Sequence, residues 1–134
     1  MNKEIDLWQF VGDRLEQNQP VMLLVVAEST GSSPGRRGYK MAVGSDGELT
    51  GSIGGGVMEV KLVDQAINFL SDAVTIAKGF REPEIREQVH QKNAVNASGM
   101  ICSGRQTVIV KQLTLVDRET VKSIIKHIDR KSVV

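Results

Sequence analysis

Apolar residues recur along this chain with two different spacings, and these predict where helices and strands form. Residues 21–27 are a continuous apolar run with several β-branched members, which predicts a strand buried on both faces at the centre of a sheet. Apolar residues three or four positions apart are typical of an amphipathic helix with one buried side. This spacing predicts three helices: residues 4–17, residues 56–70, and a final helix capped by Asp117.

The remaining segments predict a sheet around the apolar run. Residues 39–43 and 48–53 are expected to be strands joined by a hairpin turn at residues 44–47. Residues 73–78 and 107–113 are expected to be the last two strands. The polar segment 79–99 has no strand pattern, and we expect at most a short helix there, around Ile85 and Val89. The resulting order predicts an α/β fold: a single domain over residues 1–134, with a mixed β-sheet of about five strands and flanking helices.

Composition excludes several classes of protein. The 17 basic and 16 acidic residues give a net charge of +1, which does not favour nucleic-acid binding. The longest apolar run, residues 21–27, is too short to span a membrane, and the first residues lack a signal-peptide pattern. We therefore expect a cytoplasmic protein. His90 and His127 have no acidic or cysteine neighbour at metal-binding spacing, so we expect no metal site, and no catalytic triad can be assembled.

The three consecutive glycines Gly54, Gly55 and Gly56 separate a predicted strand from a predicted helix. Glycine tolerates positive φ and lets a ligand approach the backbone, and the first N–H groups of a helix attract anions. The segment is neither a Walker loop nor a dinucleotide fingerprint. We expect a phosphate or anion at this turn, near the N–H groups of Gly55 and Gly56. The alternative is a tight turn that serves only packing.

Two further segments carry candidate binding groups. The loop after the apolar run contains two hydroxyls and two guanidinium groups suited to phosphate: Ser32, Ser33, Arg36 and Arg37. Cys102, the single cysteine, lies between glycines just before the last strand, so it is either a reachable thiol or an inert buried one. We expect both segments to meet the glycine turn in one cleft, because each lies at the end of a strand or the start of a helix.

Three motifs in this order resemble the xanthine dehydrogenase accessory protein family, XdhC/CoxI, in its N-terminal domain. The first motif is Glu28 to Pro34, continuing through Lys40-Met41. The second is Gly51 to Glu59, and the third is Cys102-Ser103-Gly104. The resemblance covers about residues 21–110. Val57 stands where the family commonly has a cysteine, and Ser103 replaces a glycine.

The resemblance implies a cofactor chaperone rather than an enzyme. Such a protein binds molybdenum cofactor (molybdopterin) transiently, supports its sulfuration, and helps to insert it into a molybdenum hydroxylase such as xanthine dehydrogenase. The implied partner is that client, with a sulfur-donating desulfurase as a further candidate. Family members usually carry a C-terminal Rossmann domain, so the resemblance implies either a stand-alone version of the N-terminal domain or one that partners a separate Rossmann-domain chain. The glycines and arginines then suit the phosphate of the cofactor, and Cys102 suits its soft sulfur. We also expect a homodimer.

Two alternative functions fit the same residues. The chain is either a non-catalytic interaction subunit that partners a Rossmann chain, or a sulfur or redox carrier that depends on Cys102.

Overall fold

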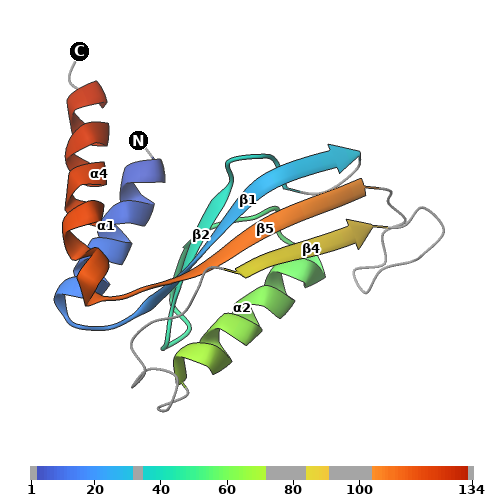
Figure 1. The fold of residues 1–134 in the computed structure, drawn as a ribbon, viewed down its shortest axis with the longest axis horizontal. Helices are drawn as coiled ribbons and strands as arrows, with labels where there is room; N and C mark the ends of the chain where they lie inside the picture. Colours follow the sequence, from blue (N-terminus) through green and yellow to red (C-terminus); the bar gives the residue numbers. More distant parts are fainter. Residues whose placement is uncertain (1–2, 32–34, 72–83, 91–103, 133–134) are drawn as a thin grey trace.

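A computed structural model of the chain describes residues 3–31, 35–71, 84–90 and 104–132 (Figure 1). The helices are α1 (Lys3–Glu16), α2 (Gly56–Ser71) and α4 (Arg118–Ser132), with a short 3-10 helix η1 (Leu115–Asp117) before α4. The strands are β1 (Val21–Gly31), β2 (Lys40–Gly44), β3 (Leu49–Gly51), β4 (Glu84–His90) and β5 (Gly104–Leu113). The expected α/β fold and the three expected helices are therefore confirmed.

The five strands form one sheet in the order β3-β2-β1-β5-β4. The apolar strand β1 is central, as its sequence predicts. All four strand pairs are antiparallel, so the expectation of a mixed sheet is wrong. The loop between β1 and β2 is too short for the crossover that a parallel pair of strands requires, and the turn at residues 44–47 reverses the chain again.

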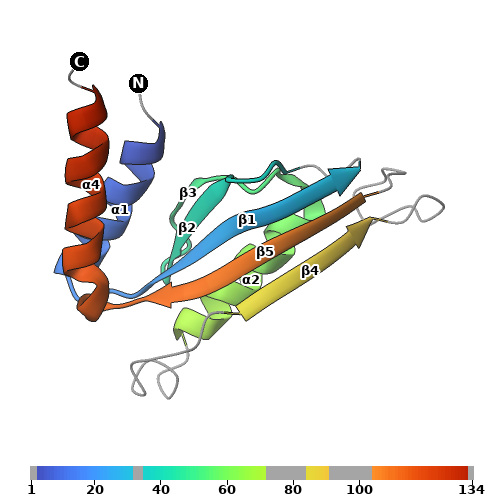
Figure 2. The ribbon, with the colours of Figure 1, turned by 45° about the horizontal axis from the view of Figure 1, so that its top comes forward.

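Helix α2 lies on one face of this antiparallel sheet, and α1 and α4 pack on the other face at the end where β1 begins, which explains why residues 21–26 of β1 are apolar on both faces (Figure 2). Met22, Leu24 and Val26 pack in one buried cluster with α2. Val21 and Leu23 point to the opposite face and pack in a second cluster with α1 and α4. Successive side chains of a strand alternate between faces, so one continuous apolar run serves two cores.

The main difference from the expected elements is the fourth strand. Residues 84–90, where a short helix was expected, form β4 and pair with β5 along its length. Pairing with a neighbouring strand stabilises an extended backbone that the local sequence does not favour. The strand expected at residues 73–78 lies outside the described residues.

Two smaller differences concern helix faces and ends. Helical spacing back from Val63 and Ile67 places Val60 on the buried stripe of α2, but Val60 is 57% exposed, and Leu62 is buried instead. Asp117, the residue directly before α4, also accepts the backbone N–H of Thr114 through its Oδ2 at 2.9 Å and so closes the turn of η1. Within the described ranges, no helix is long and apolar enough to cross a membrane.

Candidate functional site

The turn between β3 and α2 has the backbone conformation that only glycine adopts easily. Gly54, Gly55 and Gly56 have φ values of 123°, 77° and 78°. A Cβ added to Gly55 or Gly56 would meet no atom within 4 Å, so this side of the turn is open. The absence of side chains therefore leaves the backbone accessible at the N-terminus of α2, as the sequence predicts.

Glu59 supplies an anion of its own to this turn. Its Oε1 accepts hydrogen bonds from Ser52 Oγ at 2.7 Å, from the Ile53 N–H at 2.9 Å and from the Gly55 N–H at 3.0 Å. The Gly55 N–H, which we expected to contact a bound anion, is thus already used inside the protein. We expected an anion to contact the N–H groups of Gly55 and Gly56. Glu59 accepts a hydrogen bond from the first of these two and not from the second.

The loop that follows β1 packs against the same turn. Gly35 is buried, and a Cβ there would lie 2.1 Å from the backbone oxygen of Ile53. Arg36 and Arg37 follow this contact directly and are both exposed. The structure therefore brings the first two motifs together, although they are distant in sequence. Ser32 and Ser33, the hydroxyl residues expected to take part, lie outside the described residues.

The third motif is described only at its last residue. Gly104 opens β5 and is paired with Gly31, the last residue of β1, so β5 begins beside the start of the first loop. Cys102 lies outside the described residues, and its expected place in the cleft stays a prediction.

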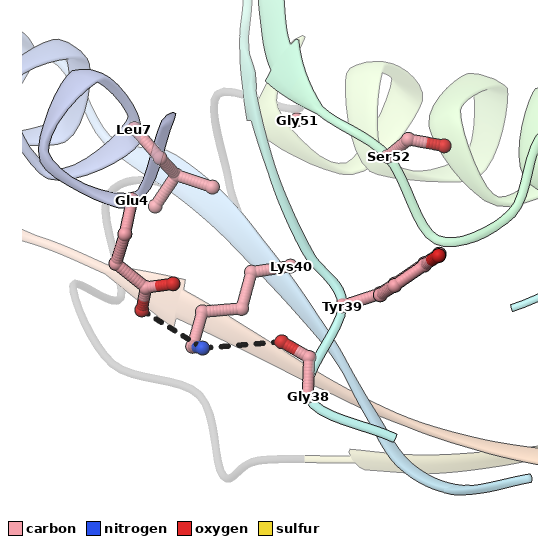
Figure 3. A pocket seen from close by; sticks show the side chains of 7 residues that line it. All are labelled: Glu4, Leu7, Gly38, Tyr39, Lys40, Gly51 and Ser52. Carbon is pink, nitrogen blue, oxygen red and sulfur yellow. Dashed lines mark hydrogen bonds and ion pairs between the residues drawn. The ribbon is translucent and has the colours of Figure 1, made fainter. Parts of the chain in front are cut away.

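A pocket of about 410 Å³ adjoins the turn on the side of α1 (Figure 3). Lys40 lines this pocket. Its Nζ forms an ion pair with Glu4 Oε1 at 2.9 Å and donates a hydrogen bond to the Gly38 carbonyl oxygen at 3.1 Å. Ser52, which bonds Glu59, also lines the pocket, so pocket and turn are contiguous. The full lining is Glu4, Leu7, Gly38, Tyr39, Lys40, Gly51 and Ser52.

Sequence reasoning missed this pocket because its walls come from three separate segments. Glu4 belongs to α1, Lys40 opens β2, and Ser52 follows β3. The one local signal is Tyr39, an aromatic residue beside a predicted binding loop, whose side chain is 44% exposed. The volume of the pocket, about 410 Å³, lies in the range of ordinary small-molecule pockets, roughly 300–1,000 Å³. Within the described part of the chain, no three His, Cys, Asp or Glu side chains are grouped as metal ligands.

Comparison with known proteins gives a family match to this region. Residues 14–78 match the model of the XdhC and CoxI family, and this segment contains the loop after β1 and the glycine turn. The resemblance that the motifs predict is therefore confirmed, and Cys102 lies beyond the matched segment.

Two further relatives extend the comparison. The chain is 30% identical over 95 residues to the uncharacterized protein YqeB of Escherichia coli K12; the aligned part is 71% of this chain and 16% of YqeB. A crystal structure described as a xanthine dehydrogenase from Bacillus halodurans has the same fold, with a TM-score of 0.69 and 20% identity. That match covers 95% of this chain and 35% of the other. This chain thus spans only a minor part of either protein.

Proposed function

We propose, from the match of residues 14–78 to the XdhC and CoxI family, that this chain is an accessory protein for a molybdenum hydroxylase. It binds molybdenum cofactor transiently, holds it during sulfuration, and passes it to a client such as xanthine dehydrogenase. Its partners are then the client enzyme and a sulfur-donating desulfurase. When bound, the cofactor supplies the sulfur-ligated metal that the client's hydroxylation chemistry needs.

The phosphate of this cofactor fits the open side of the glycine turn. The N–H groups of Gly56 and Val57 open α2 and have no acceptor within the helix, as at any helix N-terminus. Arg36 and Arg37 are exposed in the adjoining loop and would neutralise the phosphate charge. The carboxylate of Glu59 opposes an anion here, so the arginines are a necessary part of this site.

The organic part of the cofactor fits the adjoining pocket. Tyr39 offers an exposed ring face, and Ser52 places a hydroxyl where pocket and turn meet. A planar heterocycle would stack on the first and hydrogen-bond near the second. Val57, in the position where the family commonly has a cysteine, is 37% exposed at the start of α2, so any thiol contact to the cofactor falls to Cys102.

One structural observation carries the proposed site: three consecutive glycines with positive φ, with open space where the side chains of Gly55 and Gly56 would be. A turn built only for packing would fill that space. The proposal therefore predicts that a single methyl group on the open side blocks the ligand.

The test compares Gly55→Ala with Gly47→Ala. Both glycines have positive φ, 77° and 87°, so both substitutions introduce similar backbone strain, about 1–2 kcal/mol. Gly47 lies in the hairpin between β2 and β3, where a Cβ would meet only Ile67 Cδ1 at 3.9 Å. Each purified protein is incubated with molybdenum cofactor and passed through gel filtration, and the pterin that co-elutes is measured.

We expect the wild type and Gly47→Ala to retain pterin and Gly55→Ala to lose it, with equal unfolding midpoints for the two variants. Absence of pterin from the wild type would overturn the proposed function. Equal retention by both variants would remove the glycine turn from the site.

A further inference from the structure

The peptide group of Ile53, directly before the glycine turn, is fixed from both sides. Its N–H donates to Glu59 Oε1 at 2.9 Å. Its carbonyl oxygen accepts a hydrogen bond from Gln106 Nε2 at 2.8 Å. Gln106 comes from β5 and is 1% exposed, so a buried side chain of the sheet holds the turn in place.

A bulge in β1 gives Gln106 a polar neighbour under this turn. Val26 pairs with Val108, whereas Glu28 pairs with Thr107 and Ser29 with Gln106, so β1 has one extra residue at this point. Because of this bulge, Ser29 lies on the same face as Gln106, which is the face covered by α2. Ser29 Oγ donates to the carbonyl oxygen of Gly35 at 2.5 Å. Neighbouring side chains of two strands thus hold the loop and the turn.

A buried glutamine at position 106 adds little to the stability of the fold. Its Oε1 is buried and accepts no hydrogen bond from any described residue. An unpaired buried polar atom costs about 1–3 kcal/mol, which offsets the gain from the bond to Ile53. An apolar side chain of the same length would remove this unpaired atom but leave the Ile53 carbonyl oxygen without its hydrogen bond, and these two effects on stability oppose each other. The particular contribution of Gln106 is therefore the position of the Ile53 carbonyl.

We propose that Gln106 is a positioning residue for ligand binding. Through Ile53 it fixes the orientation of the peptide groups that enter the glycine turn, and so holds the N-terminus of α2 in its open conformation. This inference rests on the proposed function, because the ligand concerned is the one bound at that turn. Gln106 itself is covered by Gly35 and the turn and acts on the ligand only through Ile53.

The chain offers a matched control in Gln112. It lies on the same strand and face, 5% exposed, and its Oε1 is also without a partner among the described residues. It is six residues from Gln106, about 20 Å along an extended strand. Gln106→Met and Gln112→Met therefore make the same chemical change at two buried positions, of which only the first donates a hydrogen bond to the turn.

The first measurement is amide hydrogen exchange without ligand. The N–H groups of Ile53 and Gly55 donate to Glu59, and that of Gly54 donates to Ser52 Oγ at 3.0 Å, so their protection reports the conformation of the turn. We expect faster exchange at residues 53–55 in Gln106→Met and wild-type exchange there in Gln112→Met. The thermal unfolding midpoints should be similar, and Gln106→Leu serves as a second variant if Gln106→Met does not fold.

The second measurement is pterin retention after incubation with molybdenum cofactor. We expect Gln106→Met to retain about tenfold less than Gln112→Met, a typical loss when a supporting hydrogen bond is removed. Unchanged exchange at residues 53–55 in both Gln106 variants, or unchanged retention despite faster exchange, would overturn the positioning role. If the wild type binds no pterin, the proposed function fails, and the exchange measurement still decides whether Gln106 fixes the turn.

Discussion

Glu59 places a negative charge on the N–H groups at the start of α2, where an anionic ligand would also bind. A helix N-terminus stabilises a carboxylate as well as it stabilises a phosphate. Glu59 therefore holds the turn in shape without a ligand, but it also lowers the positive potential available to one. The exposed Arg36 and Arg37 are the cations in the adjoining loop that can restore that potential.

Arg14 is the residue that ties α1 to the β2–β3 hairpin. Its Nη2 contacts Asp46 Oδ2 at 3.0 Å and Glu48 Oε2 at 2.5 Å, and its guanidinium lies 5.0 Å from the ring centre of Phe10. The hydrogen bond from Arg14 is the main reason that the pKa of Asp46 is below its ordinary value of 3.8. The same hydrogen bond to Asp46 is the main cause that raises the pKa of Arg14.

Asp46→Asn should make the stability of the fold less sensitive to acid. Because the pKa of Asp46 is lower in the folded chain than in the unfolded one, its contribution is complete above the unfolded value of 3.8. The contribution is lost as the pH falls through the lower, folded value. Urea unfolding from about pH 6 to about pH 2 should therefore show a smaller loss of stability in Asp46→Asn than in the wild type.

The control for this prediction is the same substitution in an Arg14→Gln background. There the hydrogen bond from Arg14 is already absent, so Asp46→Asn should change the pH dependence less, and the remaining effect comes from the hydrogen bond that the Glu48 N–H donates to Asp46 Oδ1 at 3.0 Å. An equal effect of Asp46→Asn in both backgrounds would show that Arg14 is not the cause.

At the scale of elements, α1 and α4 pack against each other and cover one end of a face of the sheet, where β1 begins and β5 ends (Figure 2). Val11 and Leu15 of α1 meet Val121 of α4 in this buried cluster. The helical spacing of apolar residues in both segments predicts this, because each segment has one apolar stripe and must bury it. Gly12 lies in the interior of α1 beside this contact.

Gly12→Ala should stabilise the protein by about 1 kcal/mol, the difference in helix propensity between the two residues. The added Cβ would lie 3.5 Å from Ile125 Cδ1 and 3.6 Å from Val121 Cγ1, which are ordinary packing distances. Chemical denaturation measures the change. Gly35→Ala provides the contrast, since its Cβ would lie 2.1 Å from a backbone oxygen and should destabilise the fold. A loss of stability in Gly12→Ala would mean that α1 and α4 pack more closely than described.

At the scale of the whole molecule, the site lies at the N-terminal end of α2, where that helix meets the loop after β1 and the first part of the inner strand β5. Figure 1 shows α2 beneath the sheet. The pocket extends this site towards α1. The chain spans 16% of YqeB and 35% of the Bacillus halodurans protein, so the relatives place much additional protein around a domain of this kind.

We predict that the chain forms a homodimer, since closed two-fold dimers are by far the commonest oligomers of soluble proteins. Light scattering coupled to gel filtration should give twice the 14.7 kDa mass of the chain. A monomeric mass at high micromolar concentration would contradict this prediction.

The sequence by itself determined the features that depend on neighbouring residues. The period of apolar residues set the three helices and the central position of β1, because each pattern allows only one way to bury its side chains. Gly54, Gly55 and Gly56 determined the turn, since three consecutive positive φ values suit no other residue. The family resemblance follows from these same local motifs.

Only the tertiary structure decided the features that join distant segments. Residues 84–90 form a strand because β5 pairs with them, and all four strand pairs are antiparallel, although only the β1–β2 and β2–β3 pairs follow from short connections. The contacts of Gly35 and Gln106 with Ile53 join segments that are distant in the sequence, and no residue type in the sequence predicts the bulge in β1 that places Ser29 beside Gln106. Such contacts are set by which chain segments pack together, and a pattern read along one segment carries no information about its partner.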